Sequence, residues 1–140
     1  MGSIDIGRLP DGALLLLDSA PIIYTLEDNP LATRFRPIFD AHAGGNLRFA
    51  ISAITITEVL TGPLQKNDEA LARRYRAVLE SWQVVALDAG IAETAARLRA
   101  TLRLKLADAV QAASALAVDA AALVTHDRDF SRLKSLPVIS

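Results

Sequence analysis

Hydrophobic residues gather in short continuous runs, separated by longer segments in which apolar and polar positions mix. The clearest run occupies residues 13–17 and lies between Gly12 and Asp18. A short aliphatic run with turn-forming residues at both ends is typical of a strand that is buried on both faces. The pattern therefore predicts a strand over residues 13–18. Further apolar segments predict four more strands, at residues 47–52, 84–87, 121–125 and 137–139.

Between these runs, apolar residues recur every three or four positions, which is the spacing of an amphipathic helix. One predicted helix follows residue 52, carries Glu58 and ends at Gly62-Pro63. Asp88 is expected to cap the helix that follows it. The remaining helices are predicted at residues 20–27, 31–42, 68–81, 89–103 and 107–119.

Strands that alternate with helices predict right-handed crossovers between parallel strands. The expected fold class is α/β, a three-layer α/β/α arrangement with a central, mostly parallel sheet of four to five strands. The length of 140 residues suits a single domain. We expect residues 13–140 to form that domain, and residues 1–12, rich in glycine, to form a loose leader.

Composition narrows the possible chemistry. The chain has no cysteine, which excludes disulfides and thiolate zinc sites and fits a reducing cytoplasm. No apolar stretch is long enough to span a bilayer, so we expect a cytoplasmic protein without a membrane segment. Lys and Arg number 15 against 16 Asp and Glu, for a net charge of −1. Binding to a nucleic acid would therefore depend on a local basic surface.

Acidic residues stand at the positions where a ligand site is expected. Asp18 and Asp127 each follow a predicted strand, Asp108 begins an alanine-rich helix, and Glu58 lies in the helix after the second strand. Ligands of open α/β sheets bind beyond the carboxyl ends of the strands. Carboxylates gathered there repel one another, and a divalent cation relieves the repulsion. Oxygen ligands favour Mg²⁺ or Mn²⁺, which points to metal-dependent chemistry on a phosphate.

Four short motifs follow one another from residue 13 onward. They are Asp18-Ser19 after a strand, Ile54-Thr55-x-x-Glu58-Val59-Leu60-x-Gly62, Leu104-x-x-x-Asp108-Ala109, and Thr125-x-Asp127-x-Asp129-Phe130. Each motif is common when taken alone. Their order, and the α/β pattern that contains them, resemble those of the PIN-domain nucleases and more closely those of the VapC-type toxins of bacterial toxin–antitoxin pairs.

The resemblance implies a catalytic site made of Asp18, Glu58, Asp108 and Asp127. Our hypothesis is that Asp18 and Asp127 bind the main Mg²⁺ or Mn²⁺ directly, and that Asp108 shares this ion or binds a second one. Glu58 would hold the attacking water or help to deprotonate it. Three further residues are expected to orient the carboxylates from behind: Ser19, Thr125 and Asp129.

The reaction implied by the resemblance is hydrolysis of single-stranded RNA, which would leave a 5′-phosphate and a 3′-hydroxyl. A toxin of this kind inhibits translation and is held inactive by a cognate, VapB-like antitoxin. The family also tends to form homodimers, and the amphipathic helix near residues 68–82 offers apolar surface for such packing. The chain departs from the family pattern at Ala20, where Asn is more common, and at Ala107, where Pro often stands.

Other interpretations remain open from the sequence. The chain could be a PIN-like scaffold that binds RNA or protein without cleavage. It could also be a phosphatase or phosphotransferase with Asp18 as nucleophile, although Ala20 stands where that chemistry prefers a second aspartate. Taken singly, Asp18 could be a helix cap and Asp127 a turn former. Tyr24, Trp82 and Phe130 are interpreted as core residues and His126 as the end of a strand.

Overall fold

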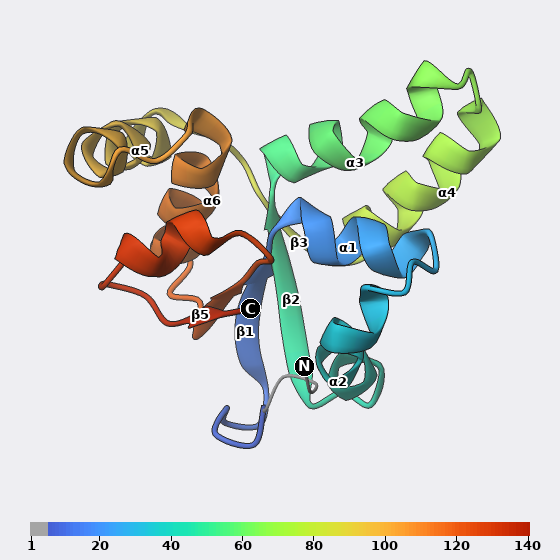
Figure 1. Ribbon diagram of the computed structural model, residues 1–140, viewed down its shortest axis with the longest axis horizontal. Coiled ribbons are helices and arrows are strands. Elements are labelled where there is room, and N and C mark those ends of the chain that lie inside the picture. Colours follow the sequence, from blue (N-terminus) through green and yellow to red (C-terminus); the bar gives the residue numbers. More distant parts are fainter. Residues whose placement is uncertain (1–5) are drawn as a thin grey trace.

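The computed structural model describes residues 6–140 and contains a single parallel sheet in the order β3-β2-β1-β4-β5. The most apolar strand, β1, lies at the centre of the sheet. Both of its edges are paired with other strands, and both of its faces are covered (Figure 1). The predicted α/β fold is confirmed. The strands are β1 Ala13–Leu17, β2 Leu47–Ser52, β3 Gln83–Val85, β4 Ala122–Val124 and β5 Val138–Ile139.

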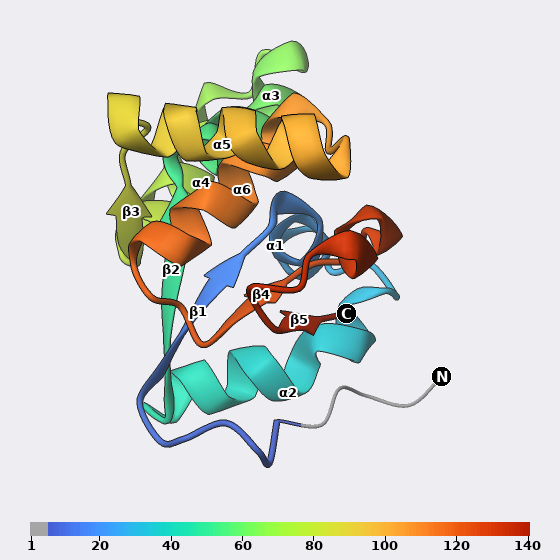
Figure 2. The same cartoon turned by 90° about the vertical axis from the view of Figure 1, so that its left-hand side faces the viewer.

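Helices cover both faces of the sheet and make the outer two layers (Figures 1 and 2). One face carries α5 and α6, which pack closely on each other, and the other carries α1 to α4. A short 3-10 helix, η1, follows β4. The helices are α1 Ser19–Leu26, α2 Ala32–Ala43, α3 Ala53–Gln65, α4 Glu69–Glu80, α5 Ala89–Leu102, α6 Leu106–Ala117 and η1 Arg128–Arg132.

The side chains of β1 alternate between two hydrophobic cores. Leu14 and Leu16 face the core that α5 and α6 cover, whereas Leu15 and Leu17 face the core beneath α1 to α4. Successive side chains of a strand point to opposite faces, so a strand covered on both sides must be apolar throughout. The continuous aliphatic run of β1 therefore places this strand, and the residue that follows it, at the middle of the molecule.

Helix α3 does not end where the sequence predicted. It passes through Gly62 and Pro63 and continues to Gln65, so the prediction that the Gly-Pro pair ends this helix is wrong. Pro63 is buried, and the chain beyond it closes further turns through Lys66 N to Pro63 O at 3.1 Å and Asn67 N to Leu64 O at 3.1 Å. Proline disfavours helical backbone at the residue before it largely through that residue's side chain, which glycine lacks. Gly62 therefore permits the helix to continue.

The segment before β1 contacts the domain. Ile6 and Leu9 pack against the core beneath α1 to α4. The Gly12 N–H donates to Asn46 O at 2.7 Å, and Arg48 Nε donates to Gly12 O at 2.8 Å. Residues 1–5 lie outside the described part of the chain, and a boundary at residue 12 stays a prediction. None of the helices over residues 6–140 is long and apolar enough to cross a membrane.

Candidate active site

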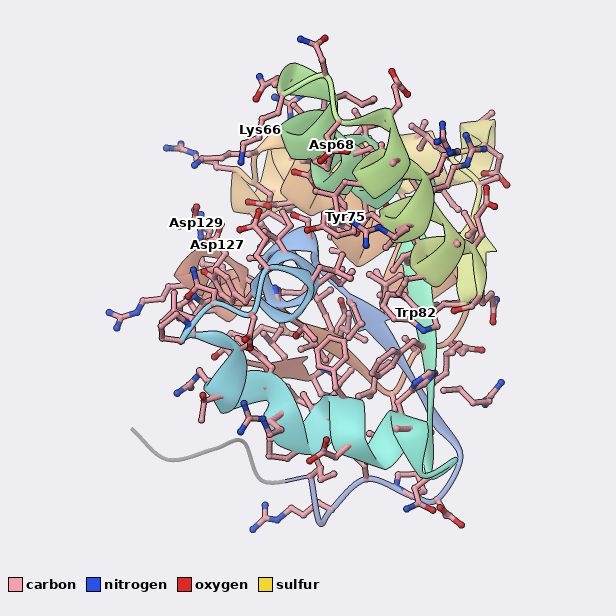
Figure 3. The ribbon with its side chains drawn as sticks, turned by 90° about the vertical axis from the view of Figure 1, so that its right-hand side faces the viewer. Lys66, Asp68, Tyr75, Trp82, Asp127 and Asp129 are labelled. Carbon is pink, nitrogen blue, oxygen red and sulfur yellow. The ribbon has the colours of Figure 1, made fainter. Side chains whose placement is uncertain are left out.

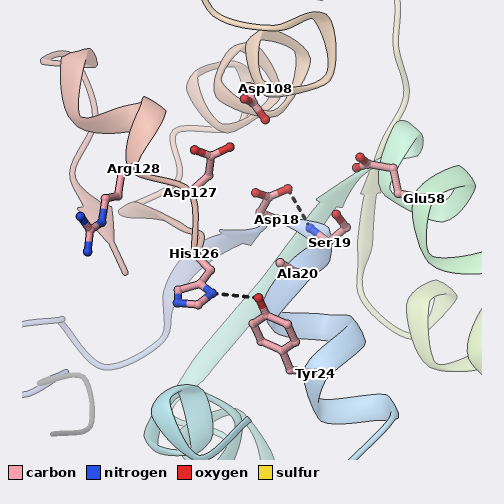
Figure 4. A pocket seen from close by; sticks show the side chains of 9 residues that line it. All are labelled: Asp18, Ser19, Ala20, Tyr24, Glu58, Asp108, His126, Asp127 and Arg128. Carbon is pink, nitrogen blue, oxygen red and sulfur yellow. Dashed lines mark hydrogen bonds between the residues drawn. The ribbon is translucent and has the colours of Figure 1, made fainter. Parts of the chain in front are cut away.

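Two neighbouring strand ends bring the first pair of acidic residues together. β1 and β4 are adjacent in the sheet, with Leu17 opposite Val124, and the Asp18 N–H donates to Val124 O at 2.8 Å. Asp18 and Asp127 therefore follow strands that end at the same edge. Helix α3 begins directly after β2 and carries Glu58 to this edge, while the first turn of α6 brings Asp108 (Figure 4).

These four carboxylates line one open pocket of about 680 Å³. In Figure 4 the carboxylates of Asp18, Asp108 and Asp127 lie around a common space, and Glu58 faces it from α3. The four sequence-predicted acidic residues are thus brought together from two strand ends and two helices. The full lining is Asp18, Ser19, Ala20, Tyr24, Glu58, Asp108, His126, Asp127 and Arg128.

Asp18 is held rigidly at the base of the pocket. Its side chain is 8% exposed, and it accepts a hydrogen bond from the Ser19 N–H on Oδ1 at 2.8 Å. The fully buried Thr125 hydroxyl donates to Oδ2 at 2.8 Å. The same hydroxyl accepts from the Asp127 N–H at 2.9 Å. Thr125 therefore connects the two strand-end aspartates and fixes the rotamer of the first.

Asp129 joins the acidic group through a tight turn. Its N–H donates to Asp127 Oδ1 at 2.8 Å, and Asp127 caps the short helix η1. Figure 3 shows Asp127 and Asp129 side by side. Carboxylate oxygens of Asp108, Asp127 and Asp129 all lie within 4.8 Å of one another. Asp129 is thus close enough to bind a shared cation itself. The sequence analysis expected it only to orient the other carboxylates.

Burial and mutual repulsion weaken the acidity of the site. The pKa of Asp108 is raised to about 6, first by burial and then by the charges of Asp127, Asp18 and Asp129, while Lys105 opposes the rise. Burial also raises the pKa of Asp18, despite the hydrogen bonds from Thr125 and Ser19. The pKa of Glu58 is raised by burial and by the charge of Asp18. Nearby carboxylates with raised pKa values are a frequent mark of functional sites.

The residues fit a divalent cation. The donors are all carboxylate oxygens, the ligand type that Mg²⁺ and Mn²⁺ prefer. Asp108 Oδ2 is buried and makes no hydrogen bond with any described residue, so it is free to bind an ion. A cation would also relieve the repulsion that raises the pKa of Asp108. The site therefore suits a metal held between α6 and the end of β4.

Comparison with known proteins identifies the family. The model of the PIN domain family matches residues 15–136, which is most of the chain. The chain belongs to the PIN domain family. The resemblance that the four motifs indicated is thereby confirmed, and with it the fold. A comparison with curated proteins found no match for this PIN domain.

Several solved structures similar to this PIN domain are toxin–antitoxin complexes or toxins. A toxin–antitoxin complex from Klebsiella pneumoniae is 27% identical, with a TM-score of 0.70 over 90% of this chain and 96% of the other. VapBC2 from Rickettsia felis, bound to a DNA fragment from its promoter, is 21% identical, with a TM-score of 0.72 over 89% and 96%. VapC20 from Mycobacterium tuberculosis, a toxin that cleaves the sarcin-ricin loop, is 17% identical, with a TM-score of 0.67 over 84% and 92%.

One wall of the PIN-domain pocket carries groups that the sequence did not assign to it. Tyr24 OH and His126 Nδ1 lie 2.8 Å apart, and the His126 ring packs edge-on against Phe35. Tyr24 also packs against the core beneath α1 to α4, so its side chain belongs both to that core and to the pocket wall. Arg128 lies on the side of the pocket away from Glu58 (Figure 4). Phe130 is fully buried, which confirms its interpretation as a core residue.

Sequence reasoning also missed Gln111 of α6. This residue is fully buried, and its Nε2 atom lies within 3.5 Å of Asp18, Thr55 and Glu58. The available signal was a long polar side chain inside an apolar helix, three positions after Asp108 and so on the same helix face. Such a residue is buried only when it has polar partners, and those partners are the site itself.

Proposed function

We propose that this PIN domain is a metal-dependent endoribonuclease that cleaves single-stranded regions of RNA. The observation that carries the proposal is the convergence of the carboxylates on one open pocket, with oxygens of Asp108, Asp127 and Asp129 within 4.8 Å of one another. A pocket this acidic would repel a phosphodiester unless cations neutralised it. The fold similarity to VapC20, a toxin that cleaves the sarcin-ricin loop, supports RNA as the substrate.

Asp108, Asp127 and Asp129 would hold Mg²⁺ or Mn²⁺, with Asp18 lying beside them. When bound, such a cation lowers the pKa of coordinated water and stabilises charge on the phosphate. Asp18 is kept in one orientation by Thr125 and Ser19, so its carboxylate offers a fixed edge to the site. Because these hydrogen bonds already hold the Asp18 carboxylate in place, no conformational entropy is lost in ordering it when the ion binds.

In the proposed reaction a water oxygen attacks the phosphorus and the bond from phosphorus to the 3′-oxygen breaks. The products are a 5′-phosphate and a 3′-hydroxyl. Glu58 would accept the proton of the attacking water, because burial raises its pKa toward the range in which a carboxylate is an effective base. The leaving 3′-oxygen takes a proton from solvent. Arg128, at the edge of the pocket, would contact the RNA backbone.

We further propose that the protein is the toxin of a toxin–antitoxin pair and inhibits translation in the cytoplasm. Its partner would be a VapB-like antitoxin, as the fold similarity to three toxin–antitoxin structures suggests. A homodimer is also proposed. Val78 of α4 and Val84 of β3 are exposed apolar residues close to each other in the chain, and they offer surface for that contact.

The direct test is incubation of the antitoxin-free protein with total cellular RNA in Mg²⁺ or Mn²⁺. Discrete fragments with 5′-phosphate ends are expected, and EDTA should abolish them. Asp18→Asn should reduce the cleavage rate by about 100-fold or more, an effect typical of losing a catalytic group. Asp40→Asn is the matched control, since Asp40 is an exposed residue of α2 outside the pocket, and it should cleave normally.

Intact RNA in all of these samples would contradict the nuclease proposal. If Mn²⁺ still raised the melting temperature of the wild type and not of Asp108→Asn, the chain would be a metal-binding scaffold without cleavage. Hydrolysis of a small phosphomonoester with RNA left intact would instead support the phosphatase alternative.

A further inference from the structure

Gln111 lies where three parts of the site meet. It is in α6, one helical turn after Asp108, and its side chain is fully buried. The amide reaches from α6 across the sheet edge to α3 and to the end of β1. Within residues 6–140, the side-chain hydrogen bonds that join α6 to α3 are those of Gln111. Nothing in the proposed reaction so far uses this residue.

Its contacts are with Thr55 and with the two site carboxylates outside the trio Asp108, Asp127 and Asp129. Gln111 Nε2 lies 2.6 Å from Thr55 Oγ1, 3.4 Å from Asp18 Oδ1 and 3.5 Å from Glu58 Oε1. A primary amide has two N–H groups, so two hydrogens serve three acceptors. The short bond to Thr55 anchors the amide, and the longer contacts place it between the two acidic side chains.

The orientation of this amide follows from the charges around it. If the amide were turned over, its oxygen would face Asp18 and Glu58 and add to the repulsion between them. With the NH₂ group facing them, the amide supplies positive partial charge between two carboxylates. The observed orientation leaves Gln111 Oε1 buried without a partner among the described residues, which costs stability. A residue selected for stability alone would be apolar at this position.

We propose that Gln111 is a positioning residue that sets the spacing between Glu58 and Asp18. It fixes α3 against α6 through Thr55 and holds the Glu58 carboxylate beside the base of the pocket. Because Asp108 lies one turn earlier in the same helix, the contact also fixes α6, and thereby the trio Asp108, Asp127 and Asp129, relative to Glu58. The effect on catalysis rests on the proposed nuclease function, whereas the contact itself does not.

The kinetic test uses Gln111→Met, which keeps the length of the side chain and removes the donor. The kcat for RNA cleavage should fall by about 10-fold, and KM should stay within about twofold, because Gln111 touches no substrate. Glu58→Gln and the double variant complete a cycle. If Gln111 acts through Glu58, the double variant loses little more than Glu58→Gln alone. Ser114→Ala is the control, since Ser114 is equally buried in α6 and its hydroxyl makes no hydrogen bond with any described residue.

An unchanged kcat in Gln111→Met, or fully additive losses in the double variant, would overturn the proposal. A melting temperature measured for every variant shows that each is folded. Gln111→Met is expected to unfold at a temperature close to that of the wild type, because removal of the unpartnered Oε1 offsets the loss of the bond to the buried Thr55.

A second measurement is independent of activity. In metal-free protein, the side-chain NH₂ resonances of Gln111 should shift in Glu58→Gln and in Thr55→Val, and should not shift in Asp40→Asn. If the Gln111 resonances were unchanged in both Glu58→Gln and Thr55→Val, the proposed contacts of the Gln111 amide would be refuted. A wild type that fails to cleave RNA would end the nuclease proposal alone, and these spectra would still decide the role of Gln111.

Discussion

Among the individual residues of the site, Asp108 is the one whose pKa is raised most strongly. Burial and three neighbouring carboxylates raise its pKa to about 6, against 3.8 for an unperturbed aspartate. The folded protein therefore binds this proton more tightly than the unfolded chain does. Linkage then requires that stability is lost as pH rises between the two values.

The first prediction concerns pH. In metal-free protein, the free energy of unfolding should fall as pH rises from about 4 to about 6 and then level off. Asp108→Asn should remove most of this fall and stabilise the metal-free protein at pH 7 by about 1–2 kcal/mol. Urea unfolding across this range, in EDTA, measures both effects. If the stability of the wild type instead rose over this range, the folded protein would not disfavour the charged form of Asp108.

The second prediction concerns Thr125. Thr125→Val keeps the shape of the side chain, and it leaves Asp18 Oδ2 and the Asp127 N–H without the hydroxyl that joins them. A buried carboxylate and a half-buried N–H lose a partner, so the free energy of unfolding should fall by about 2–3 kcal/mol. RNA cleavage should slow as Asp18 loses its fixed orientation.

Urea unfolding and cleavage assays on the same preparations measure these effects. Thr61→Val is the matched control, because the exposed Thr61 hydroxyl donates to Thr57 O of its own helix and Thr61 does not line the pocket. Equal losses in the two variants would mean that Thr125 contributes nothing beyond an ordinary hydroxyl.

The sequence was sufficient to predict which acidic residues line the pocket. Asp18 and Asp127 follow apolar strands whose ends meet in a parallel sheet, and Glu58 and Asp108 lie in motifs that resemble those of the PIN family. The sequence was equally sufficient for Asp88, which caps α5 by accepting from the Ile91 N–H three residues later. Gln111 was not predicted, since a buried amide is explained only by partners that lie 56 and 93 positions away in the chain. Contacts of this kind become visible only when the fold is known.

At the scale of elements, α3 is the segment whose sequence misleads. A Gly-Pro pair is typical of a helix end, and in this helix it lies in the interior. Strand and helix types were predictable from periodicity, whereas the end of α3 depended on the burial of Pro63 in the tertiary structure. The two residues compensate each other: proline removes a donor and crowds its predecessor, and glycine has no side chain to crowd.

The third prediction tests this compensation. Gly62→Ala should lower the free energy of unfolding while Pro63 is present, because the new Cβ meets the proline ring. In a Pro63→Ala background, the same change should raise it by about 1 kcal/mol, the usual advantage of alanine over glycine in a helix. Urea unfolding of the four proteins gives the answer. The same sign in both backgrounds would mean that Gly62 does not compensate Pro63.

At the scale of the whole molecule, the net charge of −1 gives RNA no general attraction. The pocket itself is rich in carboxylates, and Arg128 is its cationic side chain among the described residues that line it. Binding should therefore depend on a few local contacts with the backbone. Arginines on helices far from the pocket, such as Arg74 of α4, should matter little.

The fourth prediction follows from this distribution of charge. Arg128→Gln should raise the KM for RNA several-fold, with kcat within about twofold, and should reduce the slope of log KM against log salt by about 0.7, the value for one phosphate contact on a single strand. Arg74→Gln, an exposed change of the same kind, should do neither. Cleavage assays at several salt concentrations measure the slope, and equal effects of the two changes would contradict a local contact.

The order of strands in the sheet has a consequence for the moment of synthesis. β2, which pairs with one edge of β1, is synthesised soon after it. The strand that pairs with the other edge, β4, begins more than a hundred residues after the start of β1. Chains emerge from the ribosome in sequence order and fold N-terminal parts first. While β4 is still unmade, Asp18 has neither Thr125 to hold it nor Asp127 beside it. The carboxylate site of the nascent chain is thus incomplete until the last acidic pair has emerged.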